Sequence, residues 1–155
     1  MIRYRLLAKS LLVLGLLTVA ETGLVSCKKD DVSQTIAARA DLLVANDWRL
    51  TRITDTNGTI IAVNRLGVGA LALNFADIQF TDKNVARAID RSTKQIINGG
   101  TWYLVQNNEA LDVNVTGFAG IFPIIALSRT QLIIRQNTTV DGQKTDVNLE
   151  FAPSV

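Results

Sequence analysis

The side chain with the most distinctive chemistry in this sequence is the thiol of Cys27, because it is the only cysteine among the 155 residues. A solitary cysteine has no partner for a disulfide within the chain. The sequence also contains no histidine, which removes the commonest general base and the commonest transition-metal ligand. Cys27 can therefore be a free buried thiol or a site of covalent modification, and the residues around it decide between the two.

Carboxylates are the other groups that could do chemistry, and acid–base catalysis would need two of them close together. The candidates fall at predicted hairpin tips and on outward strand faces, where solvated carboxylates normally lie: Asp82, Asp90, Glu109 and Asp112. The stretch from Asp55 to Gly58 resembles part of a calcium loop, but it lacks the later glutamate and is better explained as a turn. We see no nucleophile with a base, no phosphate loop and no metal cluster. The sequence therefore predicts a protein that is not an enzyme and holds no metal or cofactor.

The segment before Cys27 has the layout of a secretory signal peptide. Arg3, Arg5 and Lys9 make a basic start, and the apolar run of residues 11–20 follows. That run would cover only about half of a ~30 Å hydrocarbon core, so it is too short for a comfortable transmembrane helix. A buried helix of a globular core would show one polar face, and this run has none.

The four residues Leu24-Val25-Ser26-Cys27 resemble a bacterial lipobox: an aliphatic residue, a tolerant position, a small residue and then cysteine. The resemblance implies that residues 1–26 are a lipoprotein signal peptide, cut off before Cys27. It also implies that the Cys27 thiol carries a diacylglycerol and that the new amino group receives a further acyl chain such as palmitate. Two or three chains hold a protein firmly to a membrane, whereas one holds it weakly.

The resemblance implies a lipid-anchored protein of the bacterial cell envelope, at the outer membrane, facing the periplasm or the cell surface. The polar run Lys28-Lys29-Asp30-Asp31 is similar to the acidic export tags of surface-displayed lipoproteins, and it can equally be a solvated linker. The sequence leaves the leaflet and the face of the membrane open.

Removal of residues 1–26 would leave 129 residues, which is the size of one domain. Because Arg3, Arg5, Lys9 and Glu21 would go with them, 13 basic and 13 acidic residues would remain and the formal net charge would be zero. The arginines are scattered, so no basic stripe suggests a nucleic-acid partner. The oligomeric state is left open.

The hydrophobic pattern predicts a short helix followed by strands. Apolar residues at helical spacing favour a helix within residues 32–45, with Ser33 as its cap, and part of this stretch can be flexible tether. We assign residues 27–40 to a lipidated, possibly helical tether and residues 41–155 to the folded domain. From Trp48 onward the period is two and turn residues recur, which predicts strands at residues 48–53, 59–63, 78–81, 85–89, 101–104, 110–115, 122–127, 131–136 and 147–151.

Short strands with tight links and one apolar face are typical of an antiparallel sandwich or barrel. The glycine pair Gly99-Gly100 predicts a bulge or a tight bend before a strand. Residues 64–77 fit a short helix, a loop or a strand, and they form the candidate loop for an envelope partner.

With the strands in this order, residues 41–155 resemble the lipocalin-like domain of bacterial lipoproteins. The resemblance rests on these pieces: Trp48-Arg49-Leu50, the turn of residues 55–58, Phe80-Thr81-Asp82-Lys83, Gly100-Thr101-Trp102-Tyr103-Leu104, Leu111-Asp112-Val113, and Ile125 to Ser128 leading to Leu132-Ile133-Ile134. It implies an all-β fold: an antiparallel, lipocalin-like barrel of about eight strands, with a short N-terminal helix or tether after the signal peptide.

The apolar residues predicted to point into this barrel are the candidate lining of a ligand cavity: Trp48, Leu50, Phe80, Trp102, Leu104, Leu111, Val113, Leu132, Ile134, Leu149 and Phe151. An eight-stranded barrel can hold one small ligand or be filled by its own side chains. An open interior would take a hydrophobic ligand, because no charged residue is placed inward. A filled interior is favoured, since the barrel is small. The two hypotheses are a binder of a small hydrophobic molecule and a packed module that presents loops to an envelope protein or glycan.

Overall fold

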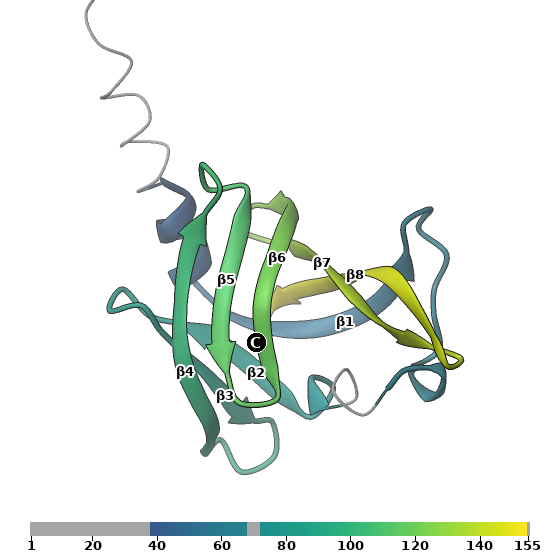
Figure 1. Ribbon diagram of the computed structural model, residues 1–155. Helices are drawn as coiled ribbons and strands as arrows, with labels where there is room; N and C mark the ends of the chain where they lie inside the picture. The colour runs from purple at the N-terminus through teal and green to yellow at the C-terminus, as the bar shows by residue number, and fades with distance from the viewer. Residues whose placement is uncertain (1–37, 68–71, 155) are drawn as a thin grey trace, which may run out of the picture.

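The computed structural model describes residues 38–67 and 72–154, and these form an eight-stranded antiparallel barrel (Figure 1). Cys27, the lipobox-like segment and the predicted signal peptide lie outside the described residues. The strands are β1 (Asp47–Asp55), β2 (Ala76–Phe80), β3 (Val85–Asp90), β4 (Ile96–Val105), β5 (Ala110–Val115), β6 (Phe118–Leu127), β7 (Leu132–Val140) and β8 (Gln143–Pro153).

Each strand pairs with its neighbours in chain order, and β8 returns to pair with β1, so the barrel is closed. The β1–β8 ladder runs from Trp48–Pro153 to Asp55–Val147, whereas β1 and β2 share only three residue pairs. All eight ladders join residues within 47–153, so described residues alone close the barrel. The predicted all-β class and the closed antiparallel barrel are confirmed.

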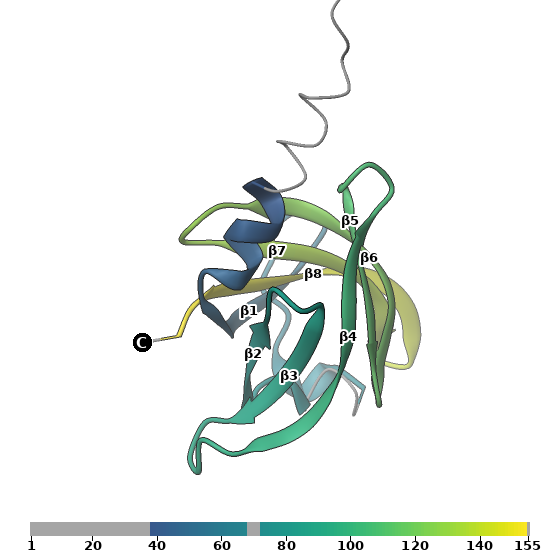
Figure 2. The same ribbon diagram turned by 90° about the vertical axis from the view of Figure 1, so that its left-hand side faces the viewer.

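A short helix of residues 38–44 precedes β1 and lies against one end of the barrel, beside the turn between β4 and β5 (Figure 2). Leu43 of this helix is completely buried, and the indole Nε1 of Trp48 donates a hydrogen bond to its carbonyl oxygen at 2.8 Å. Arg39 pairs with Glu109 in the β4–β5 turn at 3.2 Å. These contacts fasten the helix over this end of the barrel, and they confirm the predicted short helix before the first strand. In the described part of the chain no helix has the length and apolar character needed to cross a bilayer.

The core lies inside the barrel because alternate residues of every strand point inward. In β8 the inward residues Val147, Leu149 and Phe151 are all buried, and in β7 the same is true of Leu132 and Ile134. The rings of Phe80 and Trp102 meet edge to face with their centroids 5.5 Å apart. Aromatic pairs in this arrangement add about 1 kcal/mol to the stability that burial alone provides.

The prediction of a strand at residues 59–63 is wrong. This stretch pairs with β1 at a single position, Thr54 with Ile60, and then enters the short 3₁₀ helix η1 (Val63–Arg65). Ile61 and Leu66 turn inward and join the core. Burial of these two side chains therefore outweighs the β propensity of the stretch.

The chain from residue 64 to residue 77 is fastened to the barrel where the structure describes it. Leu66 forms a bridge with Val140, Leu73 is buried in the core, and β2 begins at Ala76. The last residues of the candidate partner loop are thus part of the barrel wall.

The two adjacent glycines of β4 lie within the strand, which begins before them at Ile96. The register shift between β3 and β4 falls earlier, where Ala88 pairs with Asn98 but Ile89 pairs with Ile96. The irregularity therefore lies at Ile97 and not at the predicted glycine pair, which keeps regular pairing with β3, so the glycines serve another purpose. A Cβ atom built on Gly100 would lie 1.9 Å from the carbonyl oxygen of Asn114, so β4 and β5 approach more closely there than any side chain permits.

Candidate functional site

The interior of the barrel contains a cavity of about 340 Å³. Its walls come from all eight strands, with β6 contributing only its first residue, together with residues 72–73 and the turn between β5 and β6. The residues that line it are almost all apolar, and the exceptions are Arg87, Asn98 and Thr116. Because this cavity lies inside the barrel and is predominantly apolar, we take it as the candidate functional site.

Seven of the eleven residues predicted to line a ligand cavity do line this one: Trp48, Phe80, Leu111, Val113, Leu132, Ile134 and Phe151. The other four lie elsewhere in the core. Leu50, Trp102 and Leu149 are buried away from the cavity, and the half-buried Leu104 packs against the core.

The cavity exists because several inward positions carry alanine. Ala76 of β2 and Ala86 and Ala88 of β3 line it, and their methyl groups leave space that larger side chains would fill. The expectation of a completely filled barrel therefore differs from the structure. The sequence signal that would have indicated the cavity is the alternation of Ala86 and Ala88 along β3, since the two residues share a face.

The cavity has a floor and a mouth at opposite ends of the barrel. Trp48 lines the floor, and its hydrogen bond to Leu43 joins this end to the helix of residues 38–44. At the other end the lining includes Leu73, Ile97 and Phe118, which belong to the segment before β2, the start of β4 and the start of β6. Figure 1 shows the β5–β6 turn and the β3–β4 loop together at this end, away from the helix.

The side chains of Asn98 and Arg87, two of the polar residues in the lining, already have hydrogen-bond partners. Asn98 donates from Nδ2 to the carbonyl oxygen of Thr116 at 2.8 Å and accepts from the amide of Gly99 at 2.9 Å. Arg87 donates to Gln79 of β2 at 3.2 Å. Because Ile78 and Phe80 point into the cavity, the alternating Gln79 and its partner Arg87 lie on the outer face. Arg87 therefore contributes its backbone to the wall, and its charge lies outside the cavity.

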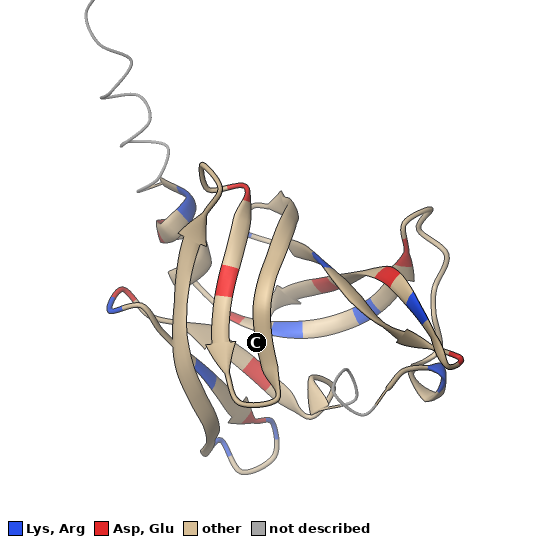
Figure 3. Cartoon of the chain, in the orientation of Figure 1, with Lys and Arg blue, Asp and Glu red and all other residues tan. Residues whose placement is uncertain are grey.

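Charged residues occur along several strands and at the turns of the barrel (Figure 3). The strongest cluster surrounds Asp77 of β2, whose side chain is only 3% exposed. Arg49 donates from Nε and Nη2 to the two carboxylate oxygens, each at 2.8 Å, and the hydroxyl of Ser154 donates to Oδ2 at 2.6 Å. Arg91 donates to Oδ1 at 3.2 Å, and the Nζ atom of Lys94 lies 3.9 Å from Oδ2. These partners lower the pKa of Asp77 to about 2, chiefly through the hydrogen bonds from Arg49 and against the opposing effect of burial.

The cluster around Asp77 joins segments that are far apart in the sequence. Arg49 faces Asp77 directly across the β1–β2 ladder, and Ser154 follows the end of β8. Arg91 also donates to the carbonyl oxygens of Leu50 and Leu73, each at 3.4 Å. Sequence reasoning missed this cluster, because neither the register of β1 with β2 nor the closure by β8 can be deduced from local patterns. Its role is to fasten the barrel where the β1–β2 ladder is short.

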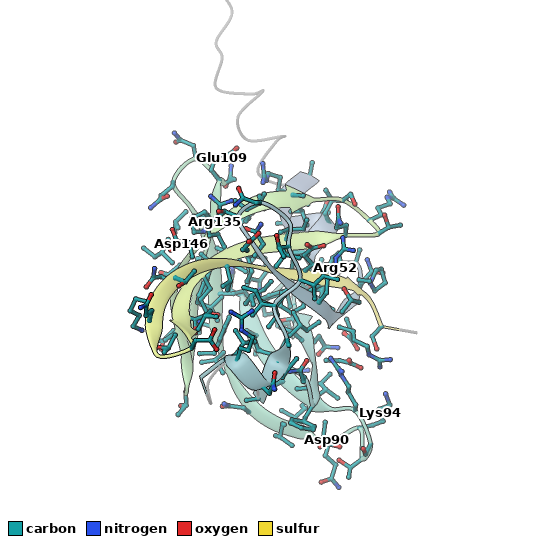
Figure 4. The ribbon with its side chains drawn as sticks, turned by 90° about the vertical axis from the view of Figure 1, so that its right-hand side faces the viewer. Arg52, Asp90, Lys94, Glu109, Arg135 and Asp146 are labelled. Atoms are coloured by element: carbon teal, nitrogen blue, oxygen red, sulfur yellow. The ribbon has the colours of Figure 1, made fainter. Side chains whose placement is uncertain are left out.

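The four carboxylates considered for acid–base chemistry do not come together. Asp82 lies in the turn after β2 and Asp112 on the outer face of β5, whereas Glu109 pairs with Arg39. Asp90 accepts hydrogen bonds from the amides of Ser92 and Thr93, and these bonds lower its pKa. Figure 4 shows Glu109 and Asp90 at opposite ends of the barrel. Within residues 38–67 and 72–154, no group of three or more acidic residues is arranged to hold a metal ion.

The stretch from Asp55 to Gly58 is a turn, as predicted. The Oδ1 atom of Asp55 accepts hydrogen bonds from the amides of Asn57 and Thr59, each at 2.8 Å, and Gly58 has a positive φ of 88°. These bonds lower the pKa of Asp55, with the amide of Thr59 as the largest cause. The carboxylate therefore stabilises its own turn.

Comparison with known proteins gives no family assignment. No protein-family model matches this sequence, and no curated protein is similar to it at a significant level. The closed barrel and its apolar cavity are therefore the features that point to a function.

Proposed function

We propose that this protein is a lipid-anchored, lipocalin-like binder of a small hydrophobic molecule, which it holds in the barrel cavity. The observation that carries the proposal is the apolar cavity of about 340 Å³, with a floor at Trp48 and a mouth at the opposite end. Ligand sites in proteins typically measure about 300–1,000 Å³ and are lined mainly by apolar side chains. The closed eight-stranded barrel supports the same reading, since barrels of this size can hold one small ligand. The role is binding rather than catalysis.

The lining favours an uncharged ligand. Within the described wall, the charge of Arg87 lies on the outer face, and the polar groups of Asn98 already have partners at the mouth. A carboxylate or an ammonium group carried into the cavity would lose its hydration without gaining an opposite charge, which is strongly unfavourable. A neutral apolar molecule loses little on the same transfer and gains about 25 cal/mol for each Å² of apolar surface that it buries.

Binding of a neutral fluorescent probe tests this proposal. The chain from Lys28 onward contains the whole barrel and helix, so it can be titrated with N-phenyl-1-naphthylamine, and with the carboxylate cis-parinaric acid for comparison. We expect saturable binding of the neutral probe at one site, weaker binding of the carboxylate, and a change in the fluorescence of Trp48, which lines the cavity. Absence of saturable binding in a chain that unfolds cooperatively would contradict the proposal.

A substitution that fills the cavity should abolish this binding. Ala86 lies in the cavity wall and is 1% exposed, so in Ala86→Leu the longer side chain would occupy the ligand's space. We expect the affinity for the neutral probe to fall at least tenfold, with stability changed by less than about 1.5 kcal/mol because the added methyl groups enter an existing space. Ala119→Leu makes the same change on the exposed outer wall of β6 and should leave probe affinity unaltered. Equal affinity in both variants would place the probe outside the cavity.

The proposed anchor has its own test. We propose that Cys27 carries acyl chains that hold the barrel at the outer membrane of a bacterium, and the lipobox-like residues before it support this. In Cys27→Ser the oxygen replaces the acylated sulfur, so the protein should move from the membrane fraction to the soluble fraction with its melting temperature unchanged. Ser26→Ala keeps a small residue before the cysteine and should stay in the membrane fraction. Retention of Cys27→Ser in membranes would count against the anchor.

A further inference from the structure

Large apolar side chains are exposed around the mouth of the cavity. Phe75 is 69% exposed, and Ile96 and Ile97 are each 57% exposed. We call these three residues the rim. Ile97 also lines the cavity, so the exposed surface of the rim continues into the apolar interior. An apolar surface of this kind, joined to a site, marks an interaction surface more strongly than scattered apolar residues do.

The strand pairing brings the rim together. Phe75 directly precedes Ala76, which pairs with Asp90 at the end of β3, and the amide of Arg91 donates to the carbonyl oxygen of Phe75 at 3.1 Å. Ile96 of β4 pairs with Ile89 of β3, which directly precedes Asp90. The three rim residues thus come from adjacent ends of β2 and β4, on either side of the end of β3.

Cationic side chains flank the rim. Lys94 lies in the β3–β4 loop, two residues before Ile96, and its side chain is 62% exposed. Figure 4 shows Lys94 and Asp90 together at the mouth end of the barrel. Lys94 has only a long contact with Asp77, at 3.9 Å, and Arg49 already binds both oxygens of that carboxylate, so the Lys94 side chain can turn to a new anionic partner.

We propose that the rim is a docking surface for an anionic phospholipid bilayer, through which the cavity exchanges its ligand. Phe75, Ile96 and Ile97 would enter the interfacial layer, while Lys94 remains at the level of the phosphate groups. Apolar side chains and basic residues act together in this way in proteins that bind membrane surfaces. The mouth would then open directly onto acyl chains, so that a hydrophobic ligand would pass into the cavity without crossing water.

The bilayer fits the rim better than a second copy of the chain does. Two rims facing each other would bring Lys94 of one copy toward Lys94 of the other and would close both mouths, whereas an anionic surface is complementary to this lysine. The other exposed apolar residues described, such as Ile121 on the outer face of β6, lead to no cavity of this kind. They provide the matched control.

Co-sedimentation with vesicles tests the proposal on the chain from Lys28 onward, which lacks the anchor. The vesicles contain phosphatidylcholine with one third phosphatidylglycerol. We expect the double variant Phe75→Ser and Ile96→Ser, which leaves the cavity-lining Ile97 unaltered, to bind at least tenfold more weakly than the unaltered chain. The control double variant, Ile121→Ser and Ile125→Ser, removes exposed apolar side chains from the outer wall and should bind as the unaltered chain does. Lys94→Gln should weaken binding to these vesicles but not to pure phosphatidylcholine.

Several outcomes would overturn the proposal: no binding of the unaltered chain to the vesicles, equal losses in the two double variants, or a dimer in solution that only the Phe75 and Ile96 substitutions dissociate. The proposal builds on the proposed ligand cavity, but the two fail separately. Ala86→Leu should lose the fluorescent probe and keep vesicle binding, and the Phe75→Ser and Ile96→Ser variant should keep the probe and lose the vesicles. Loss of the probe by this double variant with an unchanged melting temperature would also overturn the docking proposal, because the two residues would then belong to the ligand site.

Discussion

Replacement of Gly100 by alanine is expected to prevent the barrel from folding or to destabilise it by more than about 3 kcal/mol. The new Cβ atom would lie 1.9 Å from the carbonyl oxygen of Asn114 and 2.8 Å from its carbonyl carbon. Both are backbone atoms held in the β4–β5 ladder, where Gly100 pairs with Val115, so neither can rotate away. Overpacking against side chains costs about 1–3 kcal/mol, and a clash with a fixed backbone exceeds this. The free energy of unfolding in urea, followed by tryptophan fluorescence, measures the effect.

Gly99 provides the control for this change. A Cβ atom on Gly99 would meet only the carbonyl oxygen of Ala86, at 3.5 Å, which is an ordinary contact. Gly99→Ala should therefore leave stability nearly unchanged, or raise it slightly by restricting the unfolded chain. If the two variants proved equally stable, the close approach of β4 to β5 would be refuted. The marked curvature of β4 in Figure 2 is the shape that this close approach permits.

Replacement of Asp77 by asparagine is expected to destabilise the barrel by about 3 kcal/mol at pH 7. The substitution keeps the size of the side chain but leaves Arg49 and Arg91 without the charge that they face. Removal of one partner from a buried ion pair typically costs about 3–5 kcal/mol. We expect the lower end of that range, because the arginines are partly exposed and water can solvate them. Urea denaturation at pH 7 measures this difference.

The same carboxylate predicts how the stability depends on pH. The pKa of Asp77 is about 2 in the folded protein, against an ordinary value of 3.8, so the folded state binds this proton less tightly than the unfolded chain does. The stabilisation is therefore fully present above the unfolded pKa and is lost as the pH falls through about 2. The difference corresponds to about 2 kcal/mol. In Asp77→Asn this part of the acid dependence should be absent.

The exposed pair of Arg65 with Asp141 is the matched control for the Asp77 cluster. Both of its side chains are about half exposed, and the pair joins η1 to the β7–β8 turn. Water screens such pairs, so Asp141→Asn should change stability little. A loss as large as that of Asp77→Asn would mean that burial does not explain the strength of the Asp77 cluster.

Most of the strands could be predicted from the sequence because their signal is local. In β5, for example, Leu111, Val113 and Val115 alternate with Asp112 and Asn114, and the turn residues on either side set the ends. Residues 59–63 carry an equally good local signal and yet form no strand. The chain there must bury Ile61 and Leu66, and that requirement comes from the rest of the fold.

The candidate site was less predictable than the strands. The alternation placed Trp48, Phe80 and Phe151 inside the barrel, but it could not show whether the space between them was filled. That depends on small residues such as Ala86 and on the register that sets them opposite one another, which is a property of the closed barrel. The Asp77 cluster depends in the same way on residues 49, 91 and 154, which only closure of the barrel brings together.

An anchor at Cys27, as proposed, would fix the end of the barrel that carries the helix of residues 38–44 and leave the mouth of the cavity at the free end. Ten residues separate Cys27 from Ala38, and an extended chain of that length reaches at most about 35 Å. A strand of ten residues such as β4 is about 33 Å long and, tilted as in most barrels, spans about 25 Å of the axis. A barrel anchored at Cys27 would therefore point the mouth of its cavity away from the membrane that holds the anchor. The mouth would reach that membrane only if the ten residues after Cys27 were almost fully extended along the side of the barrel. Exchange of ligand with a second, facing membrane is therefore less constrained than exchange with the anchoring membrane.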